Sequence, residues 1–150
     1  MTSNLRTFAL ATLVAIASLT PSLHAQTTIR AQVDVPFSFD YGTTHFGRGS
    51  YIIAMNGENA LVVRNAAASQ SAMVLAQLHY DPTPADRSLV TFKKCGDRYF
   101  LEEVSIANSA TRVSVYESKS ERKAERELAL RGMESTQVAL ALAPVRPFGN

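Results

Sequence analysis

Histidine, cysteine and carboxylate side chains are the groups in this chain that could hold a metal ion or transfer a proton. His45 and His79 lie far apart in the sequence, without the short spacings that present two imidazoles to one ion. A metal site that combines them with Cys95 and Asp97 would require the fold to bring all four together. We expect both histidines in solvated loops, and we assign no metal ligand.

The patterns of nucleophilic and carboxylate catalysis are not found in the sequence either. There is no Gly-x-Ser-x-Gly motif, and the closely spaced Gly42, Gly47 and Gly49 match neither phosphate-binding pattern. Glu102 and Glu103 are adjacent, and neighbouring side chains of a regular strand point to opposite faces. We therefore expect these two carboxylates not to share a substrate, and we assign no catalytic residue and no cofactor.

The first 25 residues predict export. Arg6 is followed by an uncharged apolar run at residues 8–19, and Ala25 precedes the expected cleavage point. This run of 12 residues is short for a bilayer, which takes about 20 residues to cross. We therefore interpret residues 1–25 as a cleaved signal peptide that removes His24. The mature chain is expected in the periplasm or outside the cell, without a transmembrane segment.

The mature chain, residues 26–150, has the length of one ordinary domain. Lys and Arg number 15 against 13 Asp and Glu, and the signal peptide removes one of these cations. A charge so close to neutral argues against a nucleic-acid partner. Cys95 is the single cysteine, so an intrachain disulfide is impossible; we expect it to be buried, with a bridge between chains as the alternative.

Alternating apolar residues predict a β-rich domain over residues 26–143, with a flexible tail at residues 144–150. One strand is expected at residues 29–39, and Pro36 should place it at an edge or interrupt it. Asn56-Gly57 and Gly96-Asp97 are typical of tight hairpin turns. Further strands are expected at residues 73–78 and 111–116, with a solvated loop at residues 79–87.

The hairpin from Tyr51 to Val63 is apolar on both faces. A two-residue turn would place Ile52 and Leu61 together on the face opposite to Tyr51. One face should line the core, and the other needs a cover from the helix, a second sheet or a partner. This hairpin is therefore a candidate surface for self-association.

A helix is predicted at residues 118–131, followed by a last strand. Ser118 and Glu121 fit a capping box, and Gly132 suits the residue that ends a helix. Four cations share one helical face: Lys119, Arg122, Lys123 and Arg126. They form either an ordinary solvated face or a docking surface for an anionic partner, such as lipid headgroups or an acidic polysaccharide.

The fold class predicted from these elements is mainly β, an antiparallel sandwich or small barrel with one C-terminal helix. Four short motifs, VPFSF at residues 35–39, GRGSY at 47–51, GDRYFL at 96–101 and ERELA at 125–129, carry a resemblance that spans most of residues 33–142. Through them the chain resembles an uncharacterised family of small exported β-rich proteins of acidobacterial type. Members usually have Pro-Ala-Gly before the tyrosine, from which residues 46–49 depart. The resemblance implies export and a β-rich fold, but no activity and no functional residue.

These observations favour an exported, non-enzymatic β domain that binds a small ligand or a protein partner in the cell envelope or outside the cell. One alternative is a small secreted hydrolase that uses acidic residues and a loop histidine. Another is a structural envelope component that is held by its basic helix.

Overall fold

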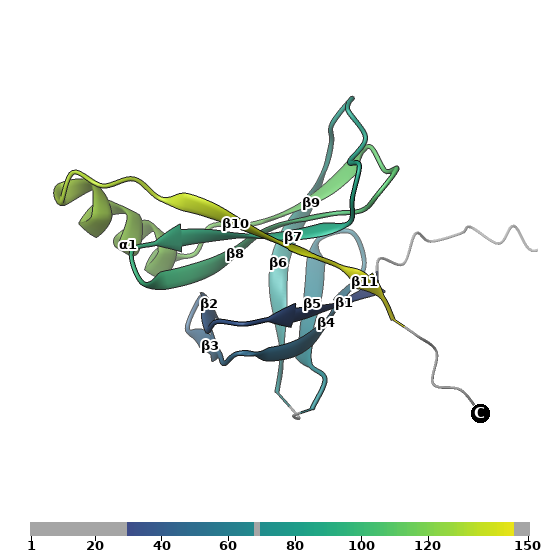
Figure 1. The fold of residues 1–150 in the computed structure, drawn as a ribbon, viewed down its shortest axis with the longest axis horizontal. Helices are drawn as coiled ribbons and strands as arrows, with labels where there is room; N and C mark the ends of the chain where they lie inside the picture. Colours follow the sequence, from purple (N-terminus) through teal and green to yellow (C-terminus); the bar gives the residue numbers. More distant parts are fainter. Residues whose placement is uncertain (1–29, 68–69, 146–150) are drawn as a thin grey trace, which may run out of the picture.

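The computed structural model describes residues 30–67 and 70–145, so the expected signal peptide lies outside the described residues. Most of these residues form strands, and one helix comes directly before the last long strand in the chain (Figure 1). In chain order the elements are β1 (Arg30–Val35), β2 (Phe39–Tyr41), β3 (Thr44–Phe46), β4 (Gly49–Met55), β5 (Ala60–Asn65), β6 (Ser71–Tyr80), β7 (Leu89–Cys95), β8 (Arg98–Ser105), β9 (Thr111–Val115), α1 (Lys119–Leu130), β10 (Thr136–Ala141) and β11 (Ala143–Pro144).

The strands pair in the order β10-β7-β8-β9-β6-β5-β4-β1-β11, and every contact along this path is antiparallel. β6 is shared, because its first half pairs with β5 and its second half with β9. β11 follows β10 after one residue and pairs with β1, so the two ends of the path meet. The strands form two layers: β7, β8, β9 and β10 make up one, and β1, β4 and β5 make up the other (Figure 1). The fold is a barrel-like antiparallel sandwich, which confirms the predicted class.

Aromatic and branched side chains fill the space between the layers. Phe39 and Phe46 stack with ring centroids 4.8 Å apart, and Tyr51 meets both rings edge-on. All three side chains are buried together with Val63 and Val104. The alternating pattern of the sequence therefore builds an ordinary core here, because a strand turns every second side chain to the same face.

The two predicted hairpin turns differ in outcome. β7 and β8 are joined by Gly96 and Asp97 alone, as expected, with Gly96 at a φ of 67°. The turn at Asn56 is wider, because the Asn56 amide donates to the carbonyl of Ala60 at 2.9 Å. Met55 consequently pairs with Leu61, and Leu61 is fully buried in the core. Tyr51 is buried in the same core, so the expectation that Leu61 lies on the face opposite to Tyr51 is wrong.

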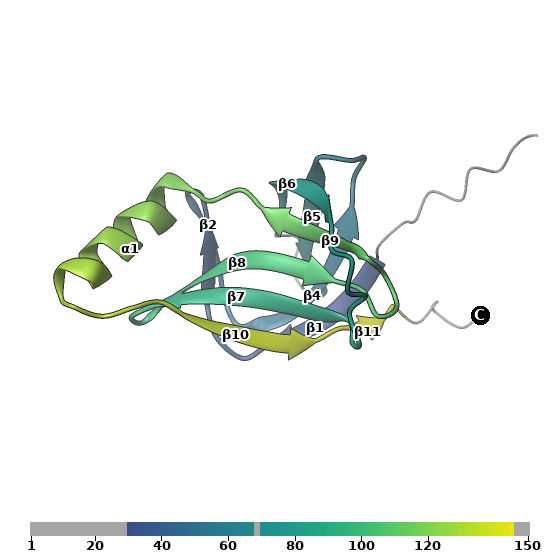
Figure 2. The same ribbon diagram turned by 90° about the horizontal axis from the view of Figure 1, so that it is seen from above.

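The outer face of this hairpin is nevertheless apolar. Val62 lies opposite Met73 in the ladder between β5 and β6, and Met73 and Leu75 are each 59% exposed. α1 packs against the end of β7 and not over this face (Figures 1 and 2). Self-association through the hairpin stays a prediction.

Several boundaries differ from the expected ones. Pro36 does interrupt the first strand, and a short β2–β3 hairpin with Gly42 in its turn follows it. His45 lies in β3 and His79 lies in β6, so the expectation of two loop histidines is wrong. Pro144, expected in the tail, belongs to β11 and pairs with Ala31, whereas residues 146–150 lie outside the described residues.

The helix forms as predicted. Ser118 is the N-cap of a complete capping box with Glu121, and Gly132 follows the helix with a φ of 69°. Ala124 and Leu128 pack against Cys95 and Phe100, which together form a second, smaller core. Cys95 is buried, as expected. Among the described residues, no helix is long and apolar enough to cross a membrane.

Candidate functional site

A β-bulge in β8 brings Glu102 and Glu103 to the same face of the sheet. Thr91 pairs with Glu103 and the next residue of β7, Phe92, pairs with Leu101, so Glu102 is an extra residue. Leu101 and Val104 both remain in the core, which leaves the two intervening side chains on the outer face. The expectation that these adjacent glutamates point to opposite faces is wrong, because the bulge resets the alternation.

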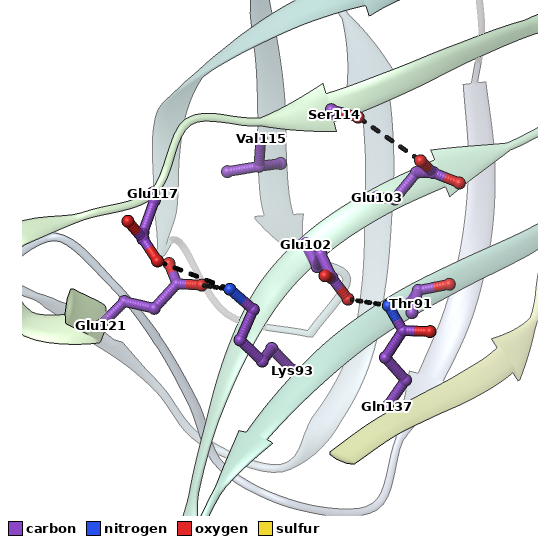
Figure 3. A pocket seen from close by; sticks show the side chains of 9 residues that line it. All are labelled: Thr91, Lys93, Glu102, Glu103, Ser114, Val115, Glu117, Glu121 and Gln137. Atoms are coloured by element: carbon purple, nitrogen blue, oxygen red, sulfur yellow. Dashed lines mark hydrogen bonds and ion pairs between the residues drawn. The ribbon is translucent and has the colours of Figure 1, made fainter. Parts of the chain in front are cut away.

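The bulge forms the floor of a groove of about 290 Å³ on the outer face of the layer. Glu102 turns towards Gln137 of β10, whose amide donates to its carboxylate at 3.0 Å, and Glu103 turns towards Ser114 of β9 (Figure 3). Nine residues line the groove: Thr91, Lys93, Glu102, Glu103, Ser114, Val115, Glu117, Glu121 and Gln137. The lining presents four carboxylates and one ammonium group, together with hydroxyl and amide groups, so it favours a positively charged, hydrogen-bonding ligand.

Lys93 lies at the helical end of the groove, among three glutamates. Its Nζ atom is 2.8 Å from Glu125, 3.1 Å from Glu121 and 3.5 Å from Glu117. Glu121 is buried at 5% side-chain exposure, whereas Glu117 and Glu125 are about one-third exposed. In the described ranges this is the one group of three acidic residues close enough to share a metal ion. The ammonium group already lies where such an ion would be, so the cluster is a closed ion-pair network.

The pKa values in this cluster follow from burial and pairing. Burial lowers the pKa of Lys93, but the hydrogen bonds and charges of Glu125 and Glu121 outweigh it, and the pKa lies above its ordinary value. Burial raises the pKa of Glu121, and Lys93 offsets this only in part. The hydrogen bond from Lys93 lowers the pKa of Glu125. Lys93 is therefore firmly cationic, and the raised pKa of Glu121 makes it easier to protonate than an ordinary glutamate.

His79 takes part in a polar network at the other end of the groove. Its Nδ1 atom is 3.1 Å from the Ser114 hydroxyl, and its Nε2 atom is 3.7 Å from Glu103. Glu103 also contacts Ser114 and Arg112, each at 3.4 Å, and Arg112 pairs with Asp81 at 2.7 Å. Serine, histidine and glutamate thus touch one another mutually. A catalytic triad would instead align them as a relay from carboxylate to imidazole to hydroxyl.

His45 lies elsewhere and does not meet His79. Its Nδ1 atom is 2.6 Å from Asp40, which also accepts two hydrogen bonds from Arg98. Burial raises the pKa of Asp40, but the hydrogen bonds from His45 and Arg98 lower it by more. The His45 carbonyl accepts from the side chain of Gln70, the residue before β6, whereas His79 is near the end of β6. Nine residues of strand span about 30 Å. The structure therefore does not gather the two histidines with Cys95.

The predicted basic face of α1 is exposed. Lys119, Arg122, Lys123 and Arg126 all face solvent, and Lys123 pairs weakly with Glu127 at 3.8 Å. The opposite side of the helix carries Glu121 and the apolar residues that contact the sheet. This agrees with a solvated face, and docking of an anionic partner stays a prediction.

Comparison of the chain with protein-family models, with curated proteins and with solved structures gave no match. The resemblance to exported acidobacterial proteins therefore rests on the four short motifs alone.

Proposed function

We propose that the protein is an exported, non-enzymatic binding domain that holds a small organic ammonium ligand in the groove of β7, β8, β9 and β10. The observation that carries the proposal is the bulge at Glu102, which adds a carboxylate to a hollow face that already contains Glu103, Glu117 and Glu121. Export is the expectation from residues 1–25. The ligand class follows from charge, because these four carboxylates outnumber the two cations that contact them, Lys93 and Arg112.

The size and chemistry of the groove narrow the ligand. A volume of about 290 Å³ is at the small end of ligand sites and suits a single ring or a short chain. Thr91, Ser114 and Gln137 supply hydroxyl and amide groups beside the carboxylates. An amine that also carries hydroxyl groups would satisfy both kinds of lining group. A sugar-like amine is therefore a suitable probe.

Titration of the purified protein with glucosamine, followed by amide chemical shifts in NMR, tests the proposal. We expect saturable shifts at Thr91, Glu103, Ser114 and Gln137, and weaker binding at high salt. Glucose, which has a hydroxyl in place of the ammonium group, serves as the matched ligand. Equal binding of glucose, or shifts confined to residues away from the groove, would refute a charge-selective site.

A pair of variants separates the groove from general surface charge. Glu102→Gln removes one carboxylate but can still bond to Gln137, and we expect about tenfold weaker glucosamine binding from the loss of a charged hydrogen bond. Glu58→Gln makes the same change in the exposed β4–β5 loop, outside the groove, and should leave binding unchanged. An equal loss in both variants would show that only the net charge matters.

The contact between Ser114 and His79 favours a second candidate, a hydrolase. In this alternative His79 would take the proton of the Ser114 hydroxyl as its oxygen attacks an ester carbonyl. The ester C–O bond would break, the alcohol would leave with that proton, and water would then release the acyl group from Ser114. Turnover of p-nitrophenyl acetate that disappears in both Ser114→Ala and His79→Ala variants would support it. No turnover above that of free imidazole would favour the binding domain.

A further inference from the structure

β10 is a sheet edge that lacks the usual protection against pairing with another strand. It is the outermost strand of its layer, beside β7, and its six residues, TQVALA, contain no charge and no proline (Figure 2). Its register with β7 is unbroken, so no bulge twists the edge away. Natural edge strands usually carry at least one of these devices, because an open row of backbone groups pairs readily.

The hydrogen-bond pattern identifies the backbone groups that face the open side. The Leu142 amide donates to the carbonyl of Ser88 at 2.9 Å, in line with the register of β10 on β7. Bonded positions alternate in an antiparallel ladder, so Leu140 and Val138 also bond to β7. The amide and carbonyl groups of Gln137 and Ala139 therefore point outwards, and both residues are exposed.

β1 occupies this same edge only further along the chain. Within the described residues, β1 pairs with β11 at two positions, Gln32 with Ala143 and Ala31 with Pro144. Beyond Gln32 no further pairing of β1 with this edge is formed, although β1 also lies close to β10, and Val35 and Leu140 line an open hollow of about 540 Å³. Among the described strands only β7 pairs with β10, so the outer side of β10 at Gln137 and Ala139 can pair with another extended chain.

We propose that a second copy of this chain binds there, by antiparallel pairing of β10 with β10 about a two-fold axis at Val138. Gln137 of each copy then lies opposite Ala139 of the other, which forms about four backbone hydrogen bonds. An uncharged strand meets its own copy without like-charge repulsion. Next to the edge, Met133 is 47% exposed and Leu130 is 87% exposed. The same pairing brings Met133 towards the exposed Ala143 of the other copy, so apolar surface meets apolar surface.

Such pairing continues the sheet from one copy into the next. Residues directly opposite in an antiparallel ladder project from the same face. The side chain of Gln137 lies on the groove face, where it bonds to Glu102. Both grooves of the dimer would therefore open on the same side. The dimer itself does not depend on the identity of the ligand.

Sedimentation equilibrium of the purified protein, from micromolar to near-millimolar concentration, measures the expected reversible monomer–dimer equilibrium. Ala139→Pro removes the outward amide of β10 and leaves its bonds to β7 intact. The dimer loses two hydrogen bonds, so we expect the dissociation constant to rise about 30-fold or more. Ala139→Ser keeps the amide and should dimerise like the wild type.

Two further variants distinguish other interfaces and guard against misfolding. Leu75→Lys adds a charge to the apolar hairpin face and should leave the dimer unchanged. If Ala139→Pro does not fold, Ala139→Lys serves instead, since it places like charges near the two-fold axis. Hydrogen exchange of the Gln137 and Ala139 amides should slow only at dimer concentrations. A wild type that stays monomeric throughout, amides that exchange rapidly at every concentration, or a dimer lost in Leu75→Lys but retained in Ala139→Pro would overturn the proposal.

Discussion

Replacement of Lys93 by Met tests how the helix is held on the sheet. Methionine keeps the unbranched apolar stem of lysine but removes the ammonium group that lies among Glu117, Glu121 and Glu125. Glu121 then remains buried without a cation, at 5% side-chain exposure. We expect a large loss of stability, because an unpaired buried charge costs more than the pair contributes.

Two physical limits set the size of this loss in the free energy of unfolding. A charge-assisted hydrogen bond to the buried Glu121 contributes about 2 kcal/mol, and the pairs with Glu117 and Glu125, which are about one-third exposed, add about 0.5 kcal/mol each. Alternatively, Glu121 can take up a proton. At pH 7 this costs at most about 3.4 kcal/mol from its unperturbed pKa of 4.5. Both routes give about 3 kcal/mol, or a decrease in Tm of about 12 °C for a domain of this size.

The pH dependence has a definite sign. In the variant, the pKa of Glu121 is raised further above 4.5, so the folded state binds more protons than the unfolded state over that interval. Stability of the variant therefore falls as the pH rises, and its deficit shrinks towards pH 4.5. In the wild type the raised pKa of Lys93 acts at the alkaline end. Its contribution is complete below 10.5 and is lost as the pH rises through the higher folded value.

Urea unfolding followed by far-UV circular dichroism measures these free energies, since the chain contains no tryptophan. Glu121→Gln in the Lys93→Met background removes the orphaned charge and keeps the capping box, and it should recover about 2 kcal/mol. Lys123→Met is the matched control, because this exposed lysine pairs weakly with Glu127, and its loss should cost less than about 0.5 kcal/mol. A loss below about 1 kcal/mol in Lys93→Met, or one that is equal at pH 4.5 and 7, would refute the reasoning.

Three other predictions concern single features. The Cys95 thiol is buried and burial raises its pKa, so it should react with Ellman's reagent only after unfolding, and rapid labelling of the native protein would contradict this. Gly96→Ala should lower the free energy of unfolding by about 1–2 kcal/mol, because Gly96 has a φ of 67° in the β7–β8 turn and alanine is strained there. Thermal unfolding at the wild-type temperature would contradict this. If the basic face of α1 holds the protein to an anionic envelope component, high salt should release it from cell fractions, and Lys123→Gln/Arg126→Gln should weaken retention at low salt.

Local chemistry was sufficient to predict much of the fold. The capping box at Ser118 fixes the start of α1, and Gly96-Asp97 fixes a two-residue turn, because both depend on residues close in sequence. The turn at Asn56-Gly57 depends instead on contacts with residues far away in the sequence. The burial of Leu61 against the other layer selects a register that a tight turn would not give. Strands of three residues, such as β2 and β3, are too short to show any periodicity.

The candidate site escaped sequence analysis because it depends on a break in the strand pattern. Leu101 and Val104 are three residues apart, and in a regular strand they would face opposite sides. Two apolar residues at this spacing can mean a bulge or the end of a strand, and only the pairing of β8 with β7 decides between them. The bulge keeps both residues in the core and thereby forces Glu102 and Glu103 outwards together. The requirement to bury Leu101 and Val104 thus produces the paired carboxylates, so a change of either to a polar residue should disturb the groove as well as the core.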